Sequence, residues 1–190
     1  STWRNNGDKS YMKPIYRSHE RMIPKIYEIC LKNKYAFQIL TASQKQDLYE
    51  ENEINYFLKL NNFNDLNFVE KKEFSDSYKY CENSKLLISY TSALAFEMYG
   101  LGIKTLFLGS IKNISENKNY PWSEIFNFLP NLVKLTDDSD YDIENKISKI
   151  ISMDSSEYLE ITQKSREYFM SYKEKYTHEL IHDRIVKKLN

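Results

Sequence analysis

The stretch "SKLLISYTSALAFEMYGLGIKTLFLG", residues 84–109, constrains the fold more than any other part of the chain. An apolar run ends at Ser89, a turn of small polar residues follows, and an apolar helical pattern leads through glycines to a second apolar run. A short helix between two buried strands is typical of a parallel sheet with right-handed crossovers. We therefore predict strands at 85–90 and 104–109 in one parallel sheet, with a helix at 92–101 between them.

The rest of the chain shows the same alternation of apolar runs and helical patterns. The other expected strands are 35–42, 66–72 and 131–135. The other expected helices are about 23–33, 44–60 (where "INYFLKL" also fits a strand), 76–83, one that begins at Asp140 or Asp142, about 155–172 and about 177–189. Pro24 suits a first helical turn and disfavours a helix that runs unbroken through it. Residues 5–14 and 111–130 read as loops, the second with one helical turn.

This alternation predicts an α/β fold of the Rossmann-like type. We expect one parallel sheet of about five to six strands with helices on both faces. A helical C-terminal segment over 141–190 follows, and residues 1–190 are expected to form a single domain. "STWR", residues 1–4, reads as the end of a further strand.

A candidate ligand site lies where the strand at 85–90 ends. In open parallel sheets, ligands bind outside the carboxyl ends of the strands. Ser89 and Tyr90 close the strand, and the backbone N–H groups of residues 92–94 are expected to be unpaired at the positive end of a helix. Such a helix start binds anions, most naturally a phosphate, and the hydroxyls of Thr91 and Ser92 add two donors.

Glu97 lies inside the same helix, between Phe96 and Met98. A buried carboxylate is costly unless it is hydrogen-bonded or paired, and a ribose diol offers two suitable hydroxyl donors. A ligand with phosphates at the helix start and a ribose beside the second turn would be a nucleotide. The alternatives are an ordinary N-cap at Ser92 and a solvated Glu97, and Gly100 or Gly102 reads as an ordinary helix C-cap.

Taken in order, these residues resemble the nucleotide-sugar-binding signature of GT-B glycosyltransferases, in their C-terminal Rossmann-like domain. The matching residues are Ser89, Thr91, Ser92, Glu97, Gly102 and the strand Lys104–Leu108. In sequence, the stretch is similar to bacterial enzymes that build capsule or other surface polysaccharide. The resemblance implies that Thr91 and Ser92 contact the donor phosphates and that Glu97 holds the ribose. Tyr90, between Ser89 and Thr91, is a further candidate for binding the donor at the same turn.

The resemblance also implies an activity. The chain would be the donor-binding domain of a metal-independent enzyme that transfers a sugar from a nucleotide-activated donor to a glycan or lipid-linked acceptor, with no cofactor. A GT-B enzyme has a second, N-terminal Rossmann-like domain, here either removed or a separate partner subunit, so the catalytic base need not belong to this chain. In such a domain Arg4 faces the cleft, where it would neutralise a diphosphate.

Further residues are weaker candidates. His19 is the candidate acid–base group, in a cluster with Arg17, Glu20 and Arg21 ahead of Pro24. Residues that follow two of the expected strands could line the same crevice: Thr41, Ser43, Lys72, Glu73 and Phe74. "HELIH", from His178 to His182, has the letters of a zinc-protease motif. Such a site would need a third ligand, either downstream or from an upstream carboxylate, and the letters arise easily by chance in a charged helix. "DDSD", 137–140, reads as a helix-start cluster and not as a metal site.

Charge, hydropathy and cysteine content indicate which partners and which compartment suit the protein. Lys and Arg number 27 and Asp and Glu number 27, so no net charge favours nucleic acid or an anionic membrane. No apolar run approaches the roughly 20 residues of a membrane span, and no signal-peptide pattern begins the chain. Cys30 and Cys81 suit a reducing cytoplasm, and attachment to the inner face of the membrane is left open.

Two other functions remain open at this point. One is a related transferase or epimerase with the same nucleotide cleft, such as a polyol-phosphate polymerase. The other is a non-catalytic Rossmann-like interaction module. A nucleotide titration separates the module from both enzymes.

Overall fold

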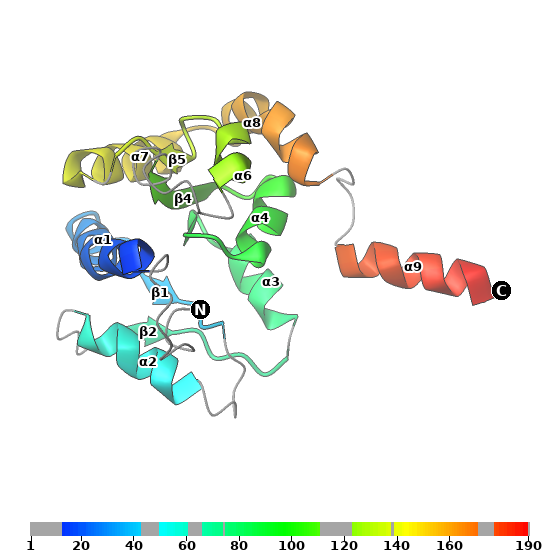
Figure 1. Cartoon of the computed structure of the whole chain (residues 1–190), viewed down its shortest axis with the longest axis horizontal. Helices are drawn as coiled ribbons and strands as arrows, with labels where there is room; N and C mark the ends of the chain where they lie inside the picture. The colour runs from blue at the N-terminus through cyan, green and yellow to red at the C-terminus, as the bar shows by residue number, and fades with distance from the viewer. Residues whose placement is uncertain are drawn as a thin grey trace.

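The structure, a computed structural model, describes residues 13–42, 50–60, 66–73, 75–110, 123–137, 139–170 and 177–189. Figure 1 shows helices around short strands. The helices are α1 Lys13–Lys32, α2 Glu50–Lys59, α3 Asp76–Glu82, α4 Ala93–Gly100, α6 Ser123–Phe128, α7 Asp140–Ser152, α8 Ser155–Phe169 and α9 Thr177–Leu189. The strands are β1 Gln38–Ile39, β2 Asn67–Phe68, β3 Leu87–Ser89, β4 Thr105–Ser110 and β5 Lys134–Leu135.

The described strands are all parallel, and they form two sheets. The first has the order β1–β2 and the second the order β3–β4–β5. Leu87 pairs with Thr105 and Ser89 with Phe107, so the predicted parallel pair around residues 84–109 is confirmed. The expected single sheet of about five to six strands is wrong for this part of the chain, because β1 and β3 are not hydrogen-bonded to each other.

The smaller sheet is short, which explains part of this difference. The strands predicted at 35–42 and 66–72 each contribute two residues to regular pairing, Gln38–Ile39 and Asn67–Phe68. Regular pairing between β1 and β2 covers only Gln38↔Asn67 and Ile39↔Phe68. Beyond these pairs, the N–H of Val69 donates to the carbonyl of Ile39 over 2.9 Å, and the Lys71 side chain bonds to Thr41.

The first helix is longer than the sequence predicts. It spans Lys13–Lys32 and contains Pro24, although Pro24 was expected in a first turn and residues 13–14 in a loop. An interior proline costs about 3 kcal/mol. Met22, Ile26 and Ile29 lie on one face of the helix with at most 2% exposure, and each buried side chain contributes about 1.5–3 kcal/mol. Burial of this face outweighs the cost of the proline.

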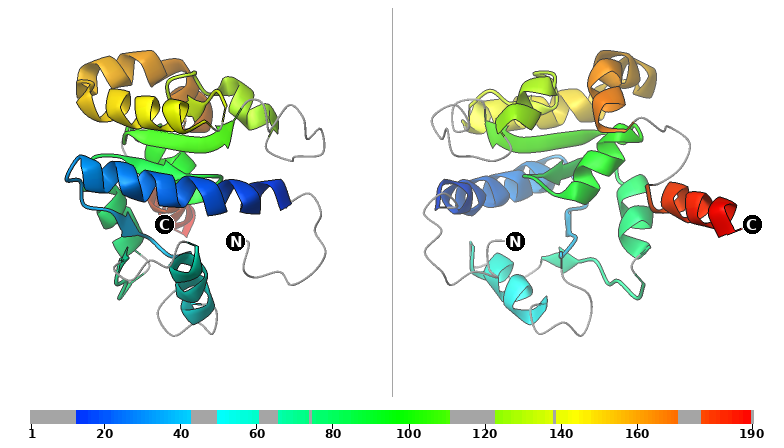
Figure 2. Two further views of the ribbon diagram at one scale, coloured as in Figure 1. Left: turned by 90° about the vertical axis from the view of Figure 1, so that its left-hand side faces the viewer. Right: turned by 45° about the vertical axis from the view of Figure 1, so that its right-hand side comes forward.

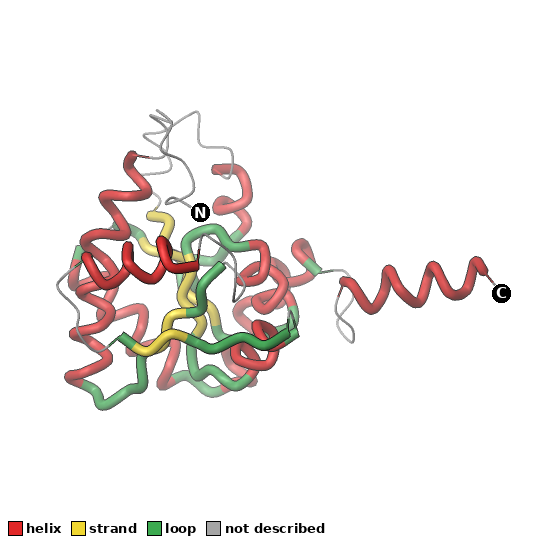
Figure 3. Tube along the Cα trace, turned by 90° about the horizontal axis from the view of Figure 1, so that it is seen from below, coloured by secondary structure: helices red, strands yellow, loops and turns green. Residues whose placement is uncertain are grey.

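The second sheet is covered by helices on both faces, as Figures 2 and 3 show. The helix α4 packs on α8, and α1 packs on α7. Between α4 and β4 the core is aromatic: Phe96 stacks on Phe107 with ring centroids 4.5 Å apart, and Tyr99 meets Phe107 edge to face at 5.6 Å. These aromatic side chains fill the core where smaller aliphatic residues are commoner.

In the described residues, the C-terminal segment consists of the helices α7, α8 and α9, as predicted. Ile143, Ile147 and Ile150 form the buried face of α7. The helix α9 projects away from the rest of the molecule (Figures 1 and 2), and its Ile181 and Ile185 are exposed.

Candidate functional site

The candidate site is the corner where the chain leaves β3 and enters α4. The N–H of Ser92 donates to Oγ of Ser89 over 3.2 Å, which closes a tight turn between strand and helix. The expectation that this N–H is free is therefore wrong. In the part of the chain that the structure describes, the next two N–H groups, of Ala93 and Leu94, have no hydrogen-bond partner. They are the donors that an anion at this helix start would meet.

The side chains of the corner differ in accessibility. Ser92 is exposed and occupies the N-cap position with extended backbone angles, φ −72° and ψ 134°, but its side chain makes no capping hydrogen bond. Thr91 is half-buried. Tyr90 is only 8% exposed and belongs to the hydrophobic core. The corner therefore offers the hydroxyls of Thr91 and Ser92 to a ligand, while Tyr90 holds the turn against the core.

Glu97 lies one turn further into α4, half-buried against α3. The hydroxyl of Tyr78 donates to its Oε2 over 2.7 Å. Burial, and then this hydrogen bond, raise the pKa of Tyr78 to about 12, so the tyrosine stays a proton donor. A carboxylate has two oxygens, and Tyr78 uses one. The sequence left open whether Glu97 is solvated. In the structure it is half-buried and bonded to Tyr78, and its Oε1 can accept a further hydrogen bond.

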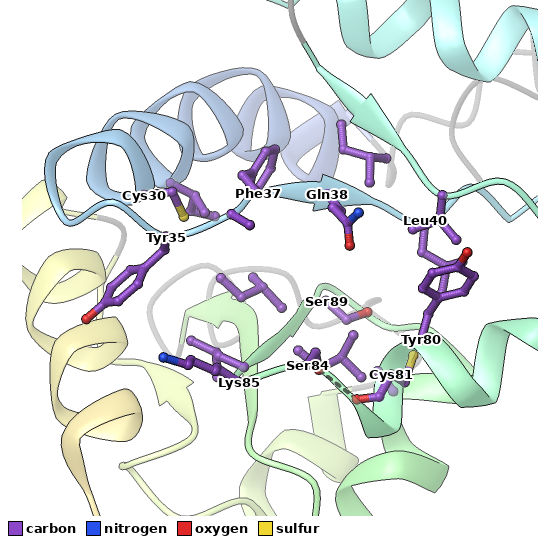
Figure 4. A pocket seen from close by; sticks show the side chains of 18 of the residues that line it. Cys30, Tyr35, Phe37, Gln38, Leu40, Tyr80, Cys81, Ser84, Lys85 and Ser89 are labelled. Carbon is purple, nitrogen blue, oxygen red and sulfur yellow. Dashed lines mark hydrogen bonds between the residues drawn. The ribbon is translucent and has the colours of Figure 1, made fainter.

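A cavity of about 550 Å³ extends from this corner between β1 and β3. Ser89 and Ser92 lie at its edge, and Figure 4 shows Ser89 facing it across from Gln38. Cys30 and Cys81 also line it, and both are free thiols. Burial raises the pKa of Cys30, and it raises that of Cys81 to about 11. Both therefore remain protonated, which makes them poor nucleophiles and poor metal ligands.

Several sequence candidates lie away from the corner or outside the described residues. Lys72 and Glu73 are exposed, and their N–H groups donate to the Asp76 carboxylate over 2.9 Å each. They start α3 and do not line the cavity. Glu20 and Arg21 are exposed on α1. Arg4, Ser43 and Phe74 lie outside the described residues, and so do the side chains of Arg17 and His19.

Thr41 belongs to a buried polar cluster at the ends of β1 and β2. Its carbonyl accepts from Nζ of Lys71 over 2.5 Å. Both oxygens of Glu53 accept from the N–H of Ala42 over 3.0 Å. Burial lowers the pKa of Lys71, while Glu53 acts in the opposite direction. The sequence pointed to Thr41 alone, because nothing in the pattern distinguishes Lys71 and Glu53 from the exposed charged residues around them.

The "HELIH" letters lie in α9. Its His182 is exposed, with Nδ1 at 3.8 Å from Asp183. The side chain of His178 lies outside the described residues. Within those residues, no group of three or more His, Cys, Asp or Glu side chains is placed to hold a metal ion. In "DDSD", Ser139 is the N-cap of α7, which begins at Asp140, and Oγ of Ser139 accepts from the N–H of Asp142.

The chain belongs to the family described as "putative O-antigen biosynthesis protein", whose sequence pattern matches residues 1–182. No curated protein and no solved structure matches this chain. Of the helices in the described ranges, none is both long enough and apolar enough to cross a bilayer. A family of this description agrees with the surface-polysaccharide role that the resemblance implied.

Proposed function

We propose that this chain binds a nucleotide-activated sugar at the corner between β3 and α4, as the donor-binding domain of a GT-B-type glycosyltransferase in O-antigen biosynthesis. The single observation that carries the proposal is the corner itself. It combines two unpaired N–H groups at a helix start, the hydroxyls of Thr91 and Ser92, and a carboxylate at Glu97 one turn away. All lie beyond the carboxyl end of a strand in a parallel sheet.

In this proposal each group has a separate task. The start of α4 holds the pyrophosphate through the N–H groups of Ala93 and Leu94 and the two hydroxyls. The Oε1 atom of Glu97 accepts from the ribose hydroxyls, while Tyr78 keeps the carboxylate in place. Donors fixed on the phosphates stabilise the negative charge that develops on the leaving nucleotide. The sugar C1 is left open to an acceptor hydroxyl, and no metal or cofactor is required.

The remaining parts of the reaction are assigned to partners. The acceptor is a glycan or a lipid-linked sugar, in keeping with the family's description. The catalytic base would come from an N-terminal GT-B domain or a partner subunit, with His19 as the weaker candidate within this chain. The reaction would take place in the cytoplasm or at the inner face of the membrane. No role for nucleic acid is proposed, because acidic and basic residues balance at 27 each.

Calorimetric titration with uridine, guanosine, cytidine and thymidine diphosphates tests this proposal. We expect saturable binding of at least one of them, weakened about tenfold or more by Thr91→Ala combined with Ser92→Ala. The matched control is Ser155→Ala with Ser156→Ala, because these exposed serines also stand at a helix start. If no diphosphate binds, or if both double variants bind like the wild type, the site assignment fails and the non-catalytic module becomes the better explanation.

Glu97→Gln separates ribose binding from phosphate binding. The amide keeps an oxygen that can accept from Tyr78 but removes the charge. We expect weaker binding of nucleoside diphosphates, by about tenfold, and unchanged binding of inorganic pyrophosphate. Glu157→Gln, at an exposed residue of α8, is the control. Equal losses for pyrophosphate and nucleotide would show that Glu97 does not recognise the ribose.

A further inference from the structure

Two large aromatic side chains are exposed side by side where α6 meets the end of α8 (Figure 1). The rings of Phe128 and Tyr168 stack with their centroids 4.2 Å apart and an interplanar angle of 11°. Phe128 is nevertheless 51% exposed and Tyr168 56%. Each ring covers one face of the other, so a ligand with a flat apolar face could cover the ring surface that water now contacts.

The aromatic core holds these two rings in place. Tyr168 meets Phe169 edge to face with centroids 5.2 Å apart, and Phe169 stacks on Phe96 of α4 at 5.0 Å. In α6, Phe128 follows closely on Phe126, which is only 2% exposed. A ligand would therefore meet rings that are already ordered, which lowers the entropic cost of binding. Because Phe96 lies in the first turn of α4, ring contacts also join the stack to the helix that begins at the candidate site.

Polar side chains flank the stack. Asn127 precedes Phe128, and Lys164 lies one turn before Tyr168 on the same face of α8, and both are exposed. In the part of the chain that the structure describes, neither side chain has a hydrogen-bond partner. An amide offers donors and an acceptor, and an ammonium group offers three donors. Both side chains can therefore bond to the hydroxyl groups of a ligand.

A pyranose sugar has both of the features that this surface suits. It is a six-membered ring, like the rings of the stack, and the C–H groups on one of its faces are attracted to the negative face of an aromatic ring. Its hydroxyl groups project outward and match the donors and acceptors of Asn127 and Lys164. The family's description concerns a surface polysaccharide, which is built of such sugars.

A protein partner fits this surface less well. A fully buried aromatic side chain covers about 150–250 Å², so two half-exposed rings offer on the order of 200 Å². A stable protein interface needs about 800 Å² on each partner. On the same face of α8, the next exposed apolar side chain is Ile161, two turns before Tyr168, and Lys164 lies between the two.

We propose that the stack of Phe128 and Tyr168 is a carbohydrate-binding surface, on which a pyranose unit of a glycan lies flat against an exposed aromatic ring. Asn127 and Lys164 bond to its hydroxyl groups and set its direction. The surface is separate from the corner at the start of α4, and carbohydrate binding there does not depend on a nucleotide. The further assignment of this glycan as the acceptor rests on the proposed function.

NMR of the whole chain with isotope-labelled Phe and Tyr rings tests the proposal. The probes are the methyl glycosides of glucose, galactose, mannose, rhamnose and N-acetylglucosamine. We expect at least one of them to move the ring signals of Phe128 and Tyr168 furthest, with one dissociation constant for both. Tyr168→Ala removes a ring and should weaken this binding about tenfold or more, whereas Tyr168→Phe keeps the ring and should stay within about threefold of the wild type.

The matched control is Tyr141→Ala, because Tyr141 is a 79% exposed tyrosine on α7. It should bind the glycoside like the wild type. Urea unfolding shows whether each variant keeps its fold, and Phe128→Ala, followed on the Tyr168 signal, is a second variant that should weaken binding. The proposal is wrong if no glycoside moves the two ring signals, or if Tyr168→Phe loses as much affinity as Tyr168→Ala. It is also wrong if the signals move with protein concentration alone, since the stack would then be a contact between copies of the chain.

Nucleoside diphosphate titration of the same variants separates this proposal from the proposed function. Tyr168→Ala should leave nucleotide binding unchanged. If it weakens nucleotide binding and not glycoside binding, the stack holds the nucleobase, and the carbohydrate-binding proposal fails while the donor corner stands. If the glycoside binds as expected and no nucleoside diphosphate binds at all, only the donor-binding function fails.

Discussion

The serines at the starts of α4 and α7 differ in what their hydroxyls bind. Oγ of Ser139 accepts from the N–H of Asp142 over 3.2 Å and caps α7. Ser92 holds the same position at α4, yet its hydroxyl makes no capping bond. Where the N-cap side chain makes no capping hydrogen bond, the first N–H groups of the helix are available to a ligand.

This difference predicts different effects on stability. Ser139→Ala should lower the free energy of unfolding by about 1 kcal/mol, because it removes a capping hydrogen bond. Ser92→Ala should lower it by less than about 0.5 kcal/mol, as at a surface position without such a bond. Urea unfolding of both variants measures the two values. An equal loss in both would mean that Ser92 caps its helix in solution, which would weaken the case for a ligand there.

Asp76 makes stability depend on pH in the acid range. The backbone N–H groups of Glu73 and Lys72, and then the Lys79 side chain, hold the pKa of Asp76 down at about 2. An unfolded Asp titrates near 3.9. The stabilisation is therefore present above about pH 4 and is lost as the pH falls toward 2. Asp76→Asn should flatten this part of the stability profile, and an NMR titration of the carboxyl group should give a midpoint near 2. A midpoint near 4 would contradict the hydrogen bonds.

At the scale of elements, α8 is tied to β4 by a buried hydroxyl. The N–H of Thr105 donates to the hydroxyl of Tyr158 over 2.9 Å, and both residues have no exposed surface. Tyr158→Phe leaves that N–H buried without its partner. We expect a loss of about 1–3 kcal/mol in the free energy of unfolding, against little change for Tyr168→Phe on the exposed side of the same helix. Equal effects of the two variants would show that this bond does not contribute.

The sequence predicted elements best where apolar periodicity and turn residues agreed. The unit from β3 through α4 to β4 was anticipated closely, because two apolar runs flank a helix that ends before Gly102, whose φ is +97°. Gly102 is thus the positive-φ residue of the two glycines proposed. The start of α1 differs from the prediction, because burial of the face that contains Met22 and Ile26 outweighs the local effect of Pro24.

For the candidate site, sequence reasoning reached the residues but not their partners. The order of Thr91, Ser92 and Glu97 in the chain pointed to the corner. The hydrogen bond from Tyr78 to Glu97 joins residues 19 positions apart in neighbouring helices, and no local pattern encodes such a contact. The same holds for Lys71 and Thr41, whose pairing depends on how β2 lies beside β1.

For the whole molecule, the proposed function rests on the family description and on one corner of the fold. The family concerns O-antigen biosynthesis, and the corner has the arrangement expected for the phosphates and ribose of a nucleotide.

The central claim is that a nucleotide's phosphates meet the start of α4. An amide NMR titration of the whole chain with the diphosphate that binds in calorimetry tests it most directly. We predict that the signals of Ala93 and Leu94 move furthest and saturate with the same dissociation constant, and that Thr91→Ala with Ser92→Ala weakens both responses. Binding that leaves these two signals in place while others move would contradict the account.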